Sequence, residues 1–127
     1  MLRVLYVGLG GFIGSVSRYL ISLCAPKLFG PQFPMGTLIV NVLGAILIGF
    51  IMELSLNRGN FSPELRLFLT TGIMGGFTTF STFSYETITL LSTGHTASGL
   101  LNIGLNLFLS LGGVLLGKFL ARLAFGV

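Results

Sequence analysis

Apolar stretches, each long enough for a membrane-crossing helix, alternate along the chain with short segments rich in proline, glycine or charge. A helix needs about 20 mostly apolar residues to cross the roughly 30 Å hydrocarbon core of a bilayer. We therefore predict an all-α membrane protein with four transmembrane helices in one domain, residues 1–127. The expected spans run about 4–24, 36–54, 63–92 and 97–120.

Helix-breaking residues mark the segments between these spans. Residues 25–35 hold Pro26, Gly30, Pro31 and Pro34, and we expect a turn there. Residues 57–62 form a polar loop, after which Ser62 and Pro63 have the residue types of a helix start. Gly94 and His95 make the last turn, and the four crossings return both termini to one side of the membrane.

The composition excludes several classes of protein. Apolar residues make up 53% of the chain and charged residues only 8%, with a mean hydropathy of +0.97. A soluble domain carries about 25% charged residues, so this chain cannot cover itself with a water-compatible surface. Its net charge of +4 comes from scattered groups, whereas nucleic-acid binding needs a clustered basic face.

The third span has an unusual composition. Residues 72–86, GIMGGFTTFSTFSYE, combine glycines and Ser/Thr hydroxyls with phenylalanines in a stretch that should lie inside the bilayer. An unbroken helix over 63–92 would measure about 45 Å, well beyond the hydrocarbon core. We predict an interruption within 75–81, where the hydroxyls can satisfy backbone groups that a broken helix releases. Phe80 and Phe83 lie three residues apart and share a helical face.

Polar stripes follow the second and fourth spans. Thr37, Asn41 and Gly44 recur at helical spacing on the second. On the fourth, a stripe at intervals of four comprises Ser98, Asn102, Asn106 and Ser110. Asn41 alone is explained equally well by hydrogen bonding between helices. Several polar residues in line favour a wet path or a polar seam between helices.

Few charges lie within the spans. Arg18 either extends to the interface or has a buried partner, and we expect Glu86 to be hydrogen-bonded at a helix interface or near an aqueous vestibule. Near the expected terminal side lie Arg3, Arg58, Arg66, Lys118 and Arg122, and near the other side Arg18 and Lys27. This bias towards cytoplasmic termini is modest.

Three functional classes fit a small membrane bundle: an anion channel, a small four-span exporter and a structural subunit of a larger complex. Proton-coupled exporters of this size need a carboxylate in the first span, and this span has none. No nucleophile–base pair, metal-ligand cluster or phosphate loop indicates an enzyme. A structural subunit leaves the polar stripes beside an interrupted helix unexplained, and an anion channel explains them.

An anion pathway needs hydrogen-bond donors without a fixed positive charge, because a fixed Lys or Arg would trap the ion. Amides and hydroxyls supply such donors, and an aromatic ring offers its positive edge. We predict a pore lining of Phe80, Phe83, Asn41, Ser110, Thr37, Ser81, Thr82 and Asn106.

Two motifs carry a family resemblance: GTLIVN at 36–41, continuing as NVLG at 41–44, and GGFTTFSTFS at 75–84. The chain resembles the Fluc family of bacterial fluoride channels, also called CrcB proteins, over essentially its whole length. The resemblance implies passive, fluoride-selective export across the bacterial inner membrane that relieves fluoride toxicity. By motif position it implies pore roles for Phe80, Phe83, Asn41 and Ser110. Asn102 stands where some relatives have a tyrosine.

The resemblance also implies a quaternary arrangement. Two chains would pair antiparallel in a dual-topology homodimer with two pores. The backbone carbonyls of Gly75 and Thr78 from each chain would hold one structural Na⁺ at the two-fold axis. A companion chain of fixed opposite orientation is the alternative partner.

Overall fold

The computed structural model describes residues 1–59 and 61–126, with the side chain of Arg58 also outside the description. Within these residues the chain is helical and has no strand, so the predicted all-α class is confirmed. The elements are α1 (Leu2–Phe29), α2 (Met35–Arg58), α3 (Pro63–Leu67), a π-helix η1 (Phe68–Met74), α4 (Gly75–Phe77), α5 (Phe80–Ser92) and α6 (Thr96–Phe125).

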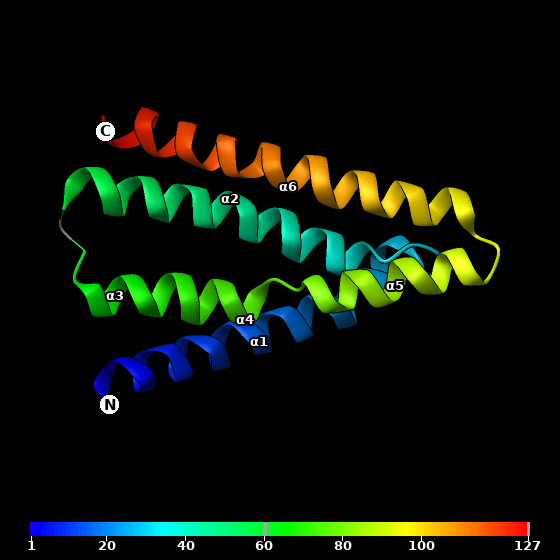
Figure 1. Cartoon of the computed structure of the whole chain (residues 1–127), viewed down its shortest axis with the longest axis horizontal. Helices are drawn as coiled ribbons and strands as arrows, with labels where there is room; N and C mark the ends of the chain where they lie inside the picture. The colour runs from blue at the N-terminus through cyan, green and yellow to red at the C-terminus, as the bar shows by residue number, and fades with distance from the viewer. Residues whose placement is uncertain (60, 127) are drawn as a thin grey trace.

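The helices form an elongated bundle with both termini at the same end, as expected (Figure 1). Three of them are long and apolar enough to cross a membrane: Leu2–Phe29, Met35–Asn57 and Thr96–Phe125. The short elements α3, η1, α4 and α5 follow one another along the bundle between α2 and α6 in sequence. These spans agree with a multi-pass membrane protein.

The predicted turn at 25–35 is wrong in its first half, because α1 continues through Pro26 to Phe29. Proline removes only its own backbone hydrogen bond, and here it does so close to the end of the helix. The Gly30 N–H still reaches the Pro26 carbonyl at 2.9 Å. Ala25 is buried close to Gly36 of α2, and this packing stabilises the last turn. The turn forms only after Gly30, whose φ of +82° favours glycine.

The predicted loop at 57–62 is also shorter than expected. Asn57 and Arg58 belong to α2, which ends at Gly59 in the left-handed conformation. Asn60 lies outside the described residues. The predicted helix start is confirmed, because the Ser62 hydroxyl accepts a hydrogen bond from the Leu65 N–H at 3.1 Å and Pro63 is the first helical residue.

Glycines let the helices approach closely at two interfaces. Along α1, a Cβ at Gly10 would lie 2.5 Å from the Phe68 carbonyl oxygen and 2.8 Å from Gly72 Cα. Along α6, a Cβ at Gly117 would lie 2.8 Å from the Phe50 N atom of α2. Such contacts are typical of membrane helices, where small residues bring backbones together. They place α1 against η1 and α4, and α2 against α6.

Large apolar side chains cover much of the outer surface, and the buried core is small. Phe108 on α6, for example, is 71% exposed. An apolar surface of this extent is unfavourable in water and suits contact with lipid. Charged pairs lie at the end that holds the termini: Glu53 is buried and contacts Arg122 Nε at 2.6 Å and Lys118 Nζ at 3.6 Å.

Candidate functional site

The chain leaves the helical conformation at two adjacent residues, Thr78 and Thr79. Thr78 has φ −83° and ψ 161°, and Thr79 has φ −152° and ψ 119°, which is extended backbone. Both positions fall within the interval 75–81 where the sequence predicts an interruption. Gly75 and Gly76 themselves stay helical. A Cβ at Gly76 would meet the Gly11 carbonyl oxygen at 2.6 Å. Gly76 therefore permits the close contact with α1, and Gly75 lines the groove, but neither residue is where the helical conformation ends.

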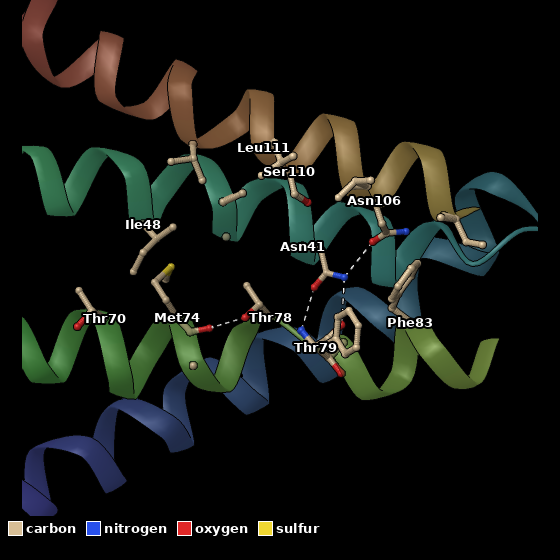
Figure 2. A pocket seen from close by; sticks show the side chains of 17 residues that line it. Asn41, Ile48, Thr70, Met74, Thr78, Thr79, Phe83, Asn106, Ser110 and Leu111 are labelled. Atoms are coloured by element: carbon tan, nitrogen blue, oxygen red, sulfur yellow. Dashed lines mark hydrogen bonds between the residues drawn. The ribbon is translucent and has the colours of Figure 1, made fainter. Parts of the chain in front are cut away.

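Side chains satisfy the backbone around the extended residues. The Thr79 hydroxyl caps α5 by accepting from the Thr82 N–H at 3.2 Å. The Asn41 side chain holds both backbone groups of Thr79: Oδ1 accepts from its N–H at 2.8 Å and Nδ2 donates to its carbonyl at 3.1 Å (Figure 2). An amide side chain thus replaces the helical partners that Thr79 gave up. Interhelical hydrogen bonding by Asn41, one of its two interpretations, is confirmed.

Asn41 continues into a line of buried amides. Its Nδ2 also donates to Asn106 Oδ1 at 2.9 Å. Asn106 Nδ2 donates to Asn102 Oδ1 at 2.9 Å and to the Asn102 carbonyl at 3.0 Å. Asn102 Nδ2 donates to Thr87 Oγ1 at 2.9 Å. Because an amide nitrogen has two hydrogens, those of Asn41 and Asn106 are fully used within the protein. Both amides therefore donate to groups of the chain itself, and their part in a pore stays a prediction.

A groove of about 590 Å³ runs along this line between α2, α6 and the interrupted segment. Its walls are mainly apolar, as at Ile48 and Leu111, and none of the lining residues that the structure describes is charged. Of the predicted pore residues, it brings together Asn41, Phe80, Phe83, Asn106 and Ser110. The Ser110 side chain makes no hydrogen bond among the described residues, so its hydroxyl remains a free donor in the groove.

Two aromatic rings stand at one end of the groove. The centroids of Phe80 and Phe83 lie 5.5 Å apart with an interplanar angle of 53°. Phe83 is half-buried, whereas Phe80 is 79% exposed. Sharing a helical face, as their spacing predicts, leaves both rings lining the groove.

The other predicted residues lie elsewhere. Ser81 and Thr82 are exposed, and neither lines the groove. Thr37 is buried and lines a second hollow of about 340 Å³, where its hydroxyl donates to Glu86 Oε1 at 2.8 Å. The expectation of a hydrogen-bonded Glu86 is confirmed. Its Oε2 atom is buried and has no hydrogen-bond partner within the described chain.

Sequence reasoning missed Thr87 as a part of the site, whereas Thr79 is among the hydroxyls expected to satisfy the backbone at the interruption. Thr87 lies one residue beyond the stretch 72–86, so the unusual composition of that stretch does not point to it. Its position four residues after Phe83, about one helical turn further on, is the signal that could have found it.

Arg18 lies against the extended segment. Its Nη1 reaches the Thr78 carbonyl oxygen at 3.5 Å, so the buried-partner interpretation of Arg18 is the one that the structure favours. In a regular helix the Thr79 N–H would bond the Gly75 carbonyl, but here it bonds Asn41 instead. The carbonyls of Gly75 and Thr78 have therefore both lost their regular helical setting, and both residues line the groove.

Comparison with known proteins identifies the family. The model of the family described as "CrcB-like protein, Camphor Resistance (CrcB)" matches residues 5–118. The chain belongs to the CrcB family.

Curated CrcB relatives match over nearly the full length. A protein of Clostridium perfringens is 59% identical over 125 residues, 98% of each chain. One of Clostridium novyi (strain NT) is 53% identical over the same length, again 98% of each chain. One of Ruminiclostridium cellulolyticum is 50% identical over 122 residues, 96% of this chain and 94% of the relative. Each is named "Fluoride-specific ion channel FluC".

Proposed function

We propose that this chain is a fluoride-selective ion channel that lets fluoride leave the cell passively across the bacterial inner membrane and so relieves fluoride toxicity. The name shared by relatives of up to 59% identity supports the choice of ion. The apolar membrane-length helices support the location. An ion channel is not an enzyme, and the family places this chain among ion channels rather than exporters or structural subunits.

The observation that carries the proposal is the groove itself. It combines the neighbouring rings of Phe80 and Phe83 with the Ser110 hydroxyl, and none of the described residues that line it is charged. A small hydrated anion exchanges water for these weak donors and can leave again, because no fixed cation holds it. Asn41 and Asn106 form the wall behind this path and hold it in shape through their hydrogen bonds.

The interrupted segment completes the membrane bundle in this proposal. Residues 63–92 form one crossing of four, made of α3, η1, α4 and α5. Extended backbone at membrane depth is tolerated where it is buried in protein or lines a water-filled cavity. Thr78 and Thr79 both line the groove, and Thr79 is also buried.

A second copy of the chain completes the pathway. The groove is open on one side, and Phe80 projects from it with most of its ring uncovered. An antiparallel partner would cover this face and supply the opposite wall, and the two-fold axis would generate two equivalent pores.

The carbonyls of Gly75 and Thr78 suit a structural Na⁺ at that axis. Neutral oxygens at a helix interruption are cation ligands in membrane proteins, and two chains would supply four. The Thr78 carbonyl has two lone pairs, so its contact with Arg18 leaves one for the ion. Bound there, the ion would satisfy carbonyls of both chains and add positive potential near the anion path.

Efflux from liposomes tests the proposed function. Purified protein is reconstituted into vesicles loaded with fluoride or with chloride, and release is followed with ion-selective electrodes against protein-free vesicles. We expect fast fluoride release with chloride release at the background level. Equal permeation of the two anions, or no release of either, would refute the fluoride assignment.

A further inference from the structure

A series of hydrogen bonds begins at Thr79, the residue that caps α5, passes through α2 and α6, and ends on α5. The Thr79 N–H donates to Asn41 on α2, which donates to Asn106 on α6. Asn106 donates to Asn102, also on α6, and Asn102 donates to Thr87 on α5. The Thr87 hydroxyl finally donates to the Phe83 carbonyl at 2.7 Å. We call these five residues and the Phe83 carbonyl the amide circuit.

Every bond of the amide circuit points the same way. Each side-chain oxygen accepts from the preceding member and the same side chain donates to the next, an arrangement in which the bonds polarise and strengthen one another. Four of its five residues are buried: Asn102 is 0% exposed, and Asn106, Thr79 and Thr87 are also buried, whereas Asn41 is half-buried at the groove. A member that lost its partner would leave an unpaired polar group inside the protein, which is costly.

The circuit holds the part of α5 that carries the aromatic rings. Its first bond lies at the residue before α5 begins, and its last lies on the Phe83 carbonyl. Phe80 is mostly uncovered, so contacts with neighbouring side chains do little to fix its position in this chain. The orientation of the first two turns of α5 therefore decides where the rings of Phe80 and Phe83 stand.

We propose that Asn102 and Thr87 are positioning residues of the ion pathway, which act through the amide circuit to orient the first two turns of α5 and with them Phe80 and Phe83. Neither lines the groove or needs to touch the ion. The proposal deepens the proposed function and rests on it for the role of the two rings.

A change at Thr87 should reach Thr79 through the successive hydrogen bonds of the amide circuit. If Thr87 loses its hydroxyl, Asn102 Nδ2 loses its acceptor in a dry site and the side chain must rotate to find another. Rotation takes Oδ1 away from Asn106 Nδ2, and this donor then competes with the Thr79 N–H for Asn41 Oδ1. The far end of the circuit, the Thr79 N–H, should therefore loosen when Thr87 changes, although Thr79 and Thr87 are not bonded to each other.

The test compares Thr87→Val with two controls. Thr87→Ser keeps a hydroxyl. Thr93→Val removes a hydroxyl that makes the same kind of bond, to the Thr89 carbonyl at 2.8 Å, at the exposed end of the same segment. We expect Thr87→Val to speed hydrogen exchange of the Thr79 amide roughly tenfold, measured by NMR in detergent micelles. Fluoride efflux should fall about tenfold and the fluoride-to-chloride ratio should drop, with both controls close to the parent.

Each outcome decides a different point. Unchanged exchange at Thr79 would overturn the circuit, and faster exchange with parental efflux and selectivity would overturn its positioning role. If Thr87→Ser, which keeps a hydroxyl, loses efflux as Thr87→Val does, the role of the hydroxyl would be overturned. If Thr87→Val does not fold, Thr87→Cys, whose thiol is a weaker donor and acceptor, should give the same changes to a smaller degree. If Phe80→Ile and Phe83→Ile leave efflux unchanged, the proposed pathway fails, while the exchange result still tests the circuit.

Discussion

Asn41 has a different part in this chain from that of a simple pore donor. Its Nδ2 hydrogens donate to the Thr79 carbonyl and to Asn106 Oδ1, and its Oδ1 accepts from the Thr79 N–H. The residue therefore holds three elements together at the point where the helical conformation stops. Ser110, by contrast, keeps its hydroxyl free in the groove.

Replacing Asn41 by aspartate tests this role. Asn41→Asp removes both donors, so the carboxylate faces the Thr79 carbonyl and Asn106 Oδ1 as a third acceptor, and when ionised it also repels an anion. We expect fluoride efflux to fall to the level of protein-free vesicles. Asn57→Ala serves as control, because within the described part of the chain the Asn57 side chain bonds Glu53, one turn back on the same helix. Parental efflux in Asn41→Asp would place Asn41 outside the pathway.

The two rings make a second prediction at this scale. Isoleucine matches the apolar character of phenylalanine but has no positive ring edge. We expect Phe80→Ile and Phe83→Ile each to lower fluoride efflux about tenfold or more, while size-exclusion chromatography shows an unchanged assembly. The matched control is Phe108→Ile, since Phe108 is exposed on α6 and does not line the groove. If all three variants release fluoride like the parent, the rings serve packing alone.

Among the elements, the contact of α1 with η1 and α4 depends on glycine. Gly10, Gly14, Gly72 and Gly76 bring the two backbones so close that an added Cβ would meet main-chain atoms of the other segment. Main-chain atoms cannot move aside as a flexible side chain can. This contact also carries Arg18 to the Thr78 carbonyl, so helix packing and the geometry of the interruption are coupled.

Gly10→Ala should destabilise the fold by about 1–3 kcal/mol, the usual cost of overpacking. Gly8→Ala is the matched control, because a Cβ at Gly8 meets nothing within 4 Å. In a helix interior, alanine is favoured over glycine by up to about 1 kcal/mol, so Gly8→Ala should be neutral or stabilising. Thermal unfolding in detergent compares the two variants, and equal midpoints would contradict the close contact.

At the scale of the whole molecule, the open groove and the uncovered Phe80 argue for a partner, and the charge distribution leaves the orientation weakly determined. Three of the basic residues at the terminal end are ion-paired, Arg3 with Glu64, and Lys118 and Arg122 with Glu53. A weak charge bias is what a chain that inserts in both orientations requires.

Dual topology predicts how a single cysteine reacts. In a Cys24→Ser background the chain has no other cysteine, so His95→Cys places one thiol in the exposed turn between α5 and α6. A membrane-impermeant maleimide added to spheroplasts should label about half of the chains, and the rest only after permeabilisation. Labelling of all chains or of none from outside would show a single orientation and favour a companion chain.

The proposed sodium site predicts a specific ion effect on the assembly. A ligand bound only to the assembled protein stabilises it in proportion to the logarithm of its concentration. We expect the thermal midpoint of the purified protein to rise with NaCl and to rise much less with KCl at equal ionic strength. Identical curves would argue against the site, and sodium carried stoichiometrically with fluoride would argue against a structural ion.

Local patterns determined much of this protein. Apolar length predicts the helices, because a bilayer admits only segments that satisfy their own backbone. The Gly10/Gly14 and Gly113/Gly117 spacings indicate close helix contacts, and the mixture of glycine, hydroxyl and phenyl groups in 72–86 indicates an interruption within a few residues of its place. The two motifs at 36–44 and 75–84 are specific enough to indicate the family.

Tertiary structure alone decided which polar groups are free. The sequence shows Asn41, Asn102, Asn106 and Ser110 as equivalent members of polar stripes, yet the three amides are bonded to one another and only Ser110 is not. Hydrogen-bond partners here come from three elements, and their distances depend on how glycine contacts set the helices against one another. Periodicity along one helix contains no information about that spacing, so a stripe can predict a polar seam without telling which of its members bind one another and which face the groove.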